Sequence, residues 1–216
     1  MTDAKQQANE ATKTLAGRAG EEGTVVLDAK GLRALAHPVR VQLVGLLRKH
    51  GPSTATRLAE RLGVNSGTAS YHLRQLGAAG FVEEDTARGN ARERWWRAVH
   101  RTTVLNDRGL ADREPEAALA YLQAITATYT LRTQQTLNEL HTMPHAWRGT
   151  FDMSDWILRL TPEETSTLRR ELEEVLGRYR RDDPEQAASA PEGAERVSVI
   201  TQILPELDTA APVEES

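Results

Sequence analysis

The stretch RLAERLGVNSGTASYHL, residues 57–73, decides the fold of the region around it. Its first half has the apolar spacing of a short amphipathic helix that ends at Gly63, where a left-handed backbone is needed. A turn follows, and Asn65 or Ser66 can cap a second helix, as Thr54 can cap the first. Two short helices joined by a glycine turn predict a helix-turn-helix.

The second of these helices has one apolar and one polar face. At about 100° per residue, Ala69, Leu73 and Leu76 point inward, and His72 lies at their flank, either as a packed side chain at the edge of the core or as part of a site. The outer face carries small and planar polar groups, which suit contact with base edges in a major groove better than packing. The expected DNA contacts on this recognition helix are Ser66, Gly67, Thr68, Ser70, Tyr71 and Arg74.

A hairpin should follow the two helices. Residues 81–84 have a strand pattern, residues 86–91 contain a Gly-Asn turn, and residues 92–99 return as a strand, which together predict a wing. Trp95 or Trp96 should anchor this hairpin to the core rather than stack on a base. Four arginines of the wing and its flank are expected to reach phosphates or the minor groove: Arg57, Arg88, Arg92 and Arg94.

Arg57 is the least certain of these four contacts, because two interpretations fit it equally. It occupies the third position of its helix, where an acidic side chain would suit the helix dipole better. A residue that costs stability there is a candidate phosphate contact, whereas the alternative is a solvated arginine.

The region before the quoted stretch completes a domain that should span residues 25–104. Asp28 can cap one helix, and Pro38 can begin another that stops at Gly51. Residues 28–101 carry 13 Lys/Arg and 6 Asp/Glu, a balance of +7, whereas the remainder carries 14 and 25, a balance of −11. A basic module on an acidic body is the charge distribution expected of a DNA-binding protein.

The parts outside this domain are predicted to be a polar, disordered arm at residues 1–24, a long helix within residues 112–145, and an acidic tail at 206–216. The long helix is too apolar on one side to stand alone in water. We expect it to pair with the same helix of a second subunit, and the alternative is packing against its own C-terminal region.

Residues 146–205 are predicted to form a small β-α-β unit. Strand patterns surround residues 155–158 and 196–204, and a helix should run from Thr161 to about Arg181. Trp147, Phe151 and Trp156 could line a pocket for an apolar effector, or they could simply be core. The fold class is therefore mainly α with small β elements (α+β): a winged helix-turn-helix, a long dimerisation helix and this unit.

Four pieces of the sequence, in order, resemble the winged-helix domain of ArsR-type bacterial transcriptional regulators: LAHPVR at 35–40, LAERLGV at 58–64, TASYHLRQL at 68–76 and AGFV at 79–82. The resemblance covers about a third of the chain. It implies a homodimer, a palindromic operator and usually repression. In that family, the residues that match Ser66, Thr68, Ser70 and Tyr71 face DNA, and those that match 88–94 form the wing.

The chain also departs from that family. Many members sense metals through cysteines, but this chain has none, and His141 and His145 are separated by Pro144, so no metal site is expected. The part from Pro115 onward is longer than in the small metal sensors and is similar to the extended ArsR-like regulators of high-GC bacteria.

Several function classes find no support in the sequence. There is no nucleophile elbow, P-loop, His-Glu-x-x-His or paired-carboxylate signature, so neither an enzyme nor a cofactor is expected. No apolar run approaches the roughly 20 residues of a membrane span, and the N-terminus lacks the apolar segment of a signal peptide, which predicts a cytoplasmic protein. The expected partners are double-stranded DNA and a second copy of the chain, and a small-molecule effector is a further candidate. A winged-helix protein-interaction module without direct DNA binding is the alternative, against which the basic charge argues.

Overall fold

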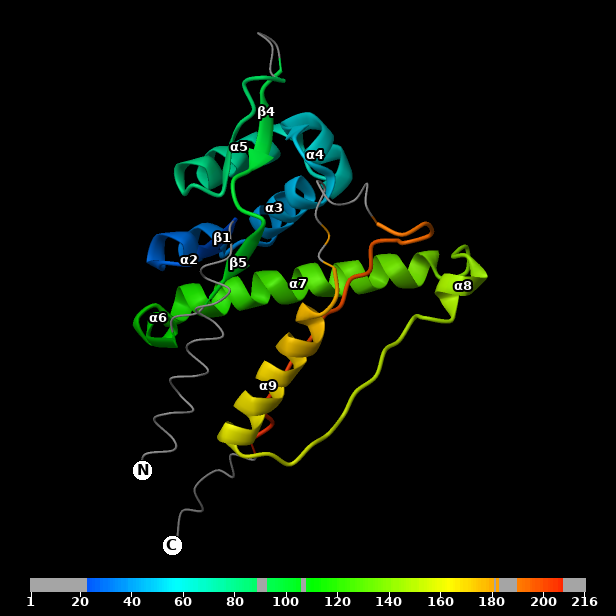
Figure 1. Cartoon of the computed structure of the whole chain (residues 1–216). Coiled ribbons are helices and arrows are strands. Elements are labelled where there is room, and N and C mark those ends of the chain that lie inside the picture. Colours follow the sequence, from blue (N-terminus) through cyan, green and yellow to red (C-terminus); the bar gives the residue numbers. More distant parts are fainter. Residues whose placement is uncertain (1–22, 89–92, 106–107, 181, 183–189, 208–216) are drawn as a thin grey trace, which may run out of the picture. The chain divides into compact units, whose positions relative to one another are not determined.

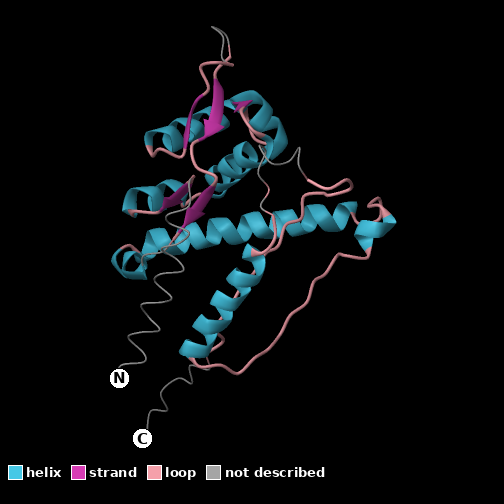
Figure 2. Ribbon diagram, viewed as in Figure 1, coloured by secondary structure: helices cyan, strands magenta, loops and turns pink. Residues whose placement is uncertain are grey.

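The computed structural model describes residues 23–88, 93–105, 108–180, 182 and 190–207. The chain divides into two compact units, residues 1–152 and 153–216. Figure 1 labels the helices and strands in chain order, and Figure 2 shows that strands occur only in the first unit among the residues described. The predicted class, mainly helical with small sheets, is confirmed.

Four helices build the helix-turn-helix part of the first unit: α2 (Ala29–Leu35), α3 (Pro38–His50), α4 (Ala55–Leu62) and α5 (Ser66–Ala78). Each begins at a residue whose side chain accepts a hydrogen bond from a backbone N–H of the first turn. Asp28 accepts from Gly31 at 2.7 Å, and Thr54 accepts from Arg57 at 3.4 Å. Such caps satisfy N–H groups that the helix itself cannot bond. The caps that the sequence predicts at these two residues are therefore confirmed.

The turn between α4 and α5 is built as its sequence predicts. Gly63 has φ 65°, and its N–H bonds back to the carbonyl of Glu60 at 3.3 Å. Glycine adopts this left-handed backbone conformation without steric strain, because it has no Cβ. Asn65 then caps α5 by accepting from the Thr68 N–H at 2.7 Å.

The wing is a three-stranded antiparallel sheet in the order β2 (Ser53–Thr54), β4 (Trp95–Ala98) and β3 (Val82–Glu84). The hairpin of β3 and β4 follows the prediction, with Glu83 opposite Arg97. Strand β2 was not predicted. It pairs Ser53 with Trp96 and so attaches the wing to the start of α4.

A second, two-stranded sheet was not predicted either. Strand β1 (Thr24–Val26) runs parallel to β5 (Thr102–Val104), with Val25 opposite Thr103. This pairing ties the beginning of the described chain to the segment that leaves the wing (Figure 1).

The core of the first unit lies between its helices and the wing. Its largest fully buried side chains are Leu32, Leu43, Leu58, Leu73, Leu76 and Val82. Trp96 is buried and lies so close to Gly77 that a Cβ there would be 3.3 Å from the indole Cζ3. Trp96 therefore anchors the wing to α5, as the sequence predicts.

The long helix is α7 (Pro115–Glu139), preceded by the short α6 (Arg108–Arg113), which was not predicted. One face of α7, with Ala118, Tyr121 and Ala124, is buried against α2 and α3. The helix ends before His141, and the four-residue α8 (His145–Arg148) follows. His141 and His145 therefore share no helix.

The second unit differs from the prediction. Helix α9 (Pro162–Gly177) is present, and Thr161 and Glu164 close its capping box. Neither predicted strand, 155–158 or 196–204, is a strand in this structure, so the β-α-β prediction is wrong for the strands. The physical reason is that an alternating sequence makes a strand only where another strand's edge bonds its backbone. Across the described parts of both units, no helix is long and apolar enough to cross a membrane.

Candidate nucleic-acid interface

Helix α5 has a buried face and an accessible face, in the positions that its sequence predicts. Ala69, Leu73 and Leu76 are buried, as is His72. The opposite face presents polar groups to solvent, and Tyr71 is 53% exposed despite its size. An exposed aromatic side chain with a polar tip on a helix held rigidly from behind is well suited to reach a groove. Of the six predicted contacts, Ser66, Gly67, Tyr71 and Arg74 are exposed, and Thr68 and Ser70 are half-buried.

A cluster of aromatic and basic side chains lies where α5 meets the start of α3. The rings of His37 and His72 are 4.4 Å apart, and those of Tyr71 and His72 are 5.3 Å apart in an edge-on arrangement. Burial and the nearby Arg40 hold the pKa of both histidines below its usual value. Burial also lowers the pKa of Arg40, and the Tyr71 phenol partly offsets that effect.

The arginines of the wing are paired with acidic side chains of β3 and of the turn after it. Arg94 lies 3.1 Å from Glu84, and Arg88 lies 3.4 Å from Asp85. Both arginines are largely exposed, although the Asp85 side chain is only 14% exposed. The exposed Arg94–Glu84 pair contributes at most about 1 kcal/mol and can be exchanged for a phosphate at small cost. Arg92 lies outside the described residues.

Arg57 lies over an aromatic ring, as Arg94 does over Trp96 at 5.9 Å. Its guanidinium carbon lies 5.1 Å from the centre of the Trp95 ring, within the range of a cation–π contact. Arg57 and Arg61 also line a cavity of about 140 Å³ together with His50 and Ser53. Stacking on Trp95 fixes the charge of Arg57 without neutralising it, which favours a contact with an anion.

The three aromatic side chains predicted for an effector pocket are distributed over both units. Trp147 and Phe151 are half-buried in the first unit, whereas Trp156 belongs to the second and is 82% exposed. None of the three lines the cavity beside α4. Groups of three or more metal-binding side chains are also absent among the described residues.

Sequence reasoning missed two basic residues of this surface. Arg61 was overlooked because an exposed arginine on an amphipathic helix has no distinguishing pattern. Arg40 has one signal in the sequence, because it stands in the first turn of α3, where a positive charge is unfavourable.

Comparison with known proteins agrees with this geometry. The model of a family described as "Helix-turn-helix domain" matches residues 35–85, which include α3, α4, α5 and β3. No curated protein matches the chain significantly.

Solved structures resemble the chain only distantly. One is the homodimeric winged helix-turn-helix DNA-binding domain of a possible ArsR-family transcriptional regulator from Mycobacterium bovis, with 23% identity over 63% of this chain and 94% of that one, at a TM-score of 0.28. A transcriptional regulator from Thermotoga maritima has 14% identity over 71% and 100%, also at 0.28. ZitR from Lactococcus lactis has 17% identity over 83% and 99%, at 0.27. Values this low carry no functional argument.

The family match coincides with the two capped helices, the glycine turn and the first wing strand that the structure describes independently. Residues 35–85 therefore carry a helix-turn-helix domain of the ArsR type, set within a winged helix-turn-helix fold.

Proposed function

We propose that this chain is a DNA-binding transcriptional regulator of the ArsR type, which binds a pseudo-palindromic operator as a homodimer and represses transcription from it. The observation that carries the proposal is the outer face of α5, which is polar and accessible while its opposite face is fully buried. A protein-docking helix would present an apolar face instead, so the alternative of a protein-interaction module finds no support here. Ser70, Tyr71 and Arg74 would discriminate bases, and Arg57 and the wing arginines would supply phosphate contacts.

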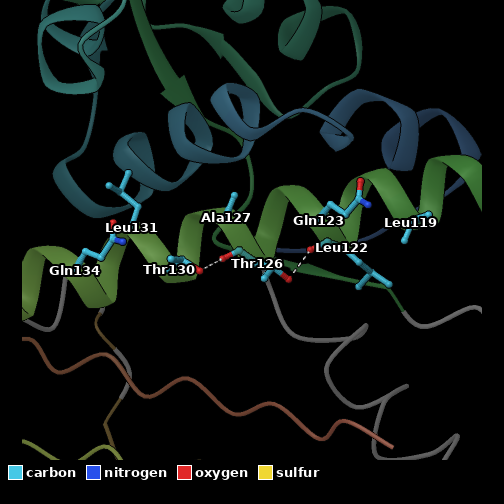
Figure 3. Close-up of a pocket in the computed structure, with 8 residues that line it drawn as sticks. All are labelled: Leu119, Leu122, Gln123, Thr126, Ala127, Thr130, Leu131 and Gln134. Atoms are coloured by element: carbon cyan, nitrogen blue, oxygen red, sulfur yellow. Dashed lines mark hydrogen bonds between the residues drawn. The ribbon is translucent and has the colours of Figure 1, made fainter. Parts of the chain in front are cut away.

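The homodimer is supported by a groove on α7. It has a volume of about 610 Å³ and is lined by one face of that helix: Leu119, Leu122, Gln123, Thr126, Ala127, Thr130, Leu131 and Gln134 (Figure 3). Leu119 and Leu122 are more than half exposed. The helix carries no charged side chain between Glu116 and Arg132. A solvated helix face would not remain free of charge over four turns, which indicates that this face is covered.

The threonines of this groove make its surface more apolar than a side chain with a hydroxyl group usually does. The Thr126 hydroxyl donates to the Leu122 carbonyl at 2.9 Å, and the Thr130 hydroxyl donates to the Thr126 carbonyl at 3.0 Å, as the dashed lines in Figure 3 mark. Because the helix's own backbone satisfies both hydroxyls, the threonines can present their methyl groups to a partner.

The groove is suited to an antiparallel copy of itself. A two-fold axis between Thr126 and Ala127 would place small side chains at the crossing, where two helices approach most closely. The same axis would set Leu122 against Leu131 of the second copy on each side. Such a dimer would present two recognition helices to successive major grooves, roughly 34–36 Å apart.

We further propose that a small apolar effector acts through one of these aromatic groups, Trp147 with Phe151 in the first unit or Trp156 in the second, and that the protein works in the cytoplasm, where an operator is accessible. The support for an effector is the large apolar surface of the second unit, whose described residues include none that is fully buried. A thermal-shift screen of small hydrophobic molecules tests it, and a panel that leaves the melting temperature unchanged would count against an effector.

The proposed operator is tested by a genome-wide footprint of the tagged protein, repeated on purified genomic DNA. A short palindromic motif that is bound by the wild type and lost in Tyr71→Ala and Arg74→Ala would support a sequence-specific regulator. Reporter expression that rises when the gene is deleted would support repression, and a fall would instead indicate activation. Binding without any motif would contradict sequence-specific recognition.

A further inference from the structure

The corner between the first turn of α3 and the outer face of α5 contains three polar groups that the proposed function has not used, His37, Arg40 and His72. Arg40 lies in the first turn of α3, and His37 caps that helix by accepting from the Val39 N–H through Nδ1 at 3.2 Å. Tyr71 and His72 meet them from α5. The corner therefore adjoins the helix face that carries the predicted base contacts.

Two nitrogen atoms in this corner have no hydrogen-bond partner. The Nε of Arg40 and the Nδ1 of His72 are both shielded from solvent and unpaired within the described structure. His72 as a whole is only 8% exposed. Polar atoms left in this state cost free energy, so proteins rarely retain them without a reason. The hydrogen bond that the Arg40 guanidinium does make is a long one, 3.2 Å from Nη2 to the Arg33 carbonyl.

The corner carries positive charge that no acidic group among the described residues balances. No acidic residue stands in the first turn of α3, whose amino end carries the positive pole of a 13-residue helix. Within the described part of the chain, Arg40 forms no ion pair with a carboxylate, in contrast to Arg88, Arg94 and Arg97 of the wing. A guanidinium remains charged at any physiological pH, so this positive charge is uncompensated.

We infer that Arg40 is a phosphate contact, which holds a backbone phosphate of the DNA strand that borders the groove entered by α5. The inference rests on the proposed DNA binding. It adds a binding site for a backbone phosphate, called here the seat, which base contacts alone do not provide. Tyr71 and His72 form the wall of this seat on the α5 side, and the positive end of α3 forms its floor. A phosphate supplies the charge and the acceptor oxygens that the corner lacks.

The DNA backbone is a better source of this anion than free phosphate, because the corner adjoins an exposed recognition surface. A protein that inserts a helix into the major groove must pass close to the phosphates on either side of it. Contacts to those phosphates fix the register of the helix and carry no sequence information. Arg40 would thus set the depth at which Tyr71 enters the groove.

The test measures binding of the full-length protein to its operator and to a scrambled duplex, by fluorescence anisotropy over a range of salt concentrations. Arg40→Gln should weaken binding to both duplexes by a similar factor and reduce the slope of log Kobs against log salt by about 0.9 per subunit. Arg40→Lys should retain most of that slope, because the charge remains. Lys49→Gln removes the same charge from the far end of α3 and should leave the slope unchanged.

The outcomes separate this inference from the proposed function. If the wild type binds no DNA, the proposed function fails. If the wild type binds and Arg40→Gln lowers affinity without changing the slope, Arg40 only supports the position of α5, and the phosphate contact is refuted. If inorganic phosphate, compared with chloride at equal ionic strength, raises the melting temperature of the DNA-free wild type and not of Arg40→Gln, the seat holds a free anion, and its assignment to DNA is overturned.

Discussion

Arg48, on α3, binds the segment after the wing through a hydrogen bond to the backbone of His100. Its Nε donates to the His100 carbonyl at 2.7 Å, and its Nη2 donates to the Thr103 hydroxyl at the same distance. Burial lowers the pKa of Arg48 to about 10, and the phenol of Tyr121 on α7 partly offsets this. Burial raises the pKa of Tyr121 to about 12. A single half-buried cation thus joins α3 to β5 and lies near α7.

Replacing Arg48 with methionine should destabilise the fold by about 1–3 kcal/mol, because two acceptors would lose a charged donor and remain in a poorly solvated place. Chemical denaturation followed by circular dichroism measures the change. Lys49→Met is the matched control on the same helix, since the Lys49 side chain is exposed, and it should change stability by less than about 0.5 kcal/mol. Equal effects in both variants would mean that the contacts of Arg48 contribute nothing.

Two glycines should respond to alanine with opposite signs. Gly63 has φ +65°, so Gly63→Ala should cost roughly 1–2 kcal/mol even though a Cβ would meet no atom within 4 Å. Gly45 lies inside α3, where a Cβ would also meet nothing, so Gly45→Ala should stabilise the fold by about 0.5–1 kcal/mol. Thermal melts of both variants beside the wild type decide the matter. A loss in Gly45→Ala would show that crowding has been underestimated.

The stability of the fold should fall as the pH is lowered through the histidine range. Burial, followed by the charge of Arg40, lowers the pKa of His37 below 6.5. Burial lowers the pKa of His72 as well, followed by His37 and then Arg40, and burial followed by Arg48 does the same for His100. The unfolded chain therefore binds more protons than the folded one in this range. The contribution of these histidines to the free energy of unfolding is therefore fully present above about pH 6.5. It is lost as the pH falls below 6.5 toward their lowered pKa values in the folded state.

Urea unfolding at pH 7.5 and pH 5.5 measures this dependence. His37→Asn should reduce it, because asparagine can still cap α3 but does not titrate. His145→Asn changes an exposed side chain of α8 and should leave the dependence as it is in the wild type. A midpoint that does not move between the two pH values would refute the prediction.

The features that could be predicted from sequence are local ones. The caps at Thr54 and Asn65 and the turn at Gly63 each depend on a few neighbouring residues, so propensity and periodicity suffice to identify them. Strand β2 has only two residues, Ser53–Thr54, and pairs with Trp95 and Trp96 about forty positions away. Because this pairing is a tertiary contact, the local sequence of β2 does not predict it. The same holds for the parallel pairing of β1 with β5.

The candidate site also has local features, which the sequence predicts, and tertiary contacts, which it does not. Helical geometry alone identified the accessible face of α5, but the contact between His37 and His72 joins residues 35 positions apart and could not be read from either motif. The ion pair of Arg97 with Glu83 follows from the hairpin register, which the sequence gives only approximately. For the second unit, alternation indicated which side chains prefer a common face but not whether a neighbouring strand exists to pair with residues 196–204.

The antiparallel register proposed for α7 can be tested with introduced cysteines, because the chain has none of its own. With the axis between Thr126 and Ala127, position 122 faces position 131 of the second copy, so Leu122→Cys combined with Leu131→Cys should form disulfide-linked dimers on mild oxidation. Leu122→Cys alone should not, because the two identical positions would be offset by nine residues, about 13 Å along the helix, and a disulfide needs Cα atoms within about 7 Å.

Non-reducing electrophoresis reads this result, and light scattering reports the size of the unoxidised protein. Leu122→Glu should shift the protein toward monomer and weaken binding to a full palindrome much more than binding to a half-site, because a buried carboxylate would oppose an apolar surface. Gln135→Glu is the matched control: it introduces the same charge on α7 at an exposed position that does not line the groove. Cross-linking by the single cysteine would reject this register, and a dimer unaffected by Leu122→Glu would place the interface on another surface.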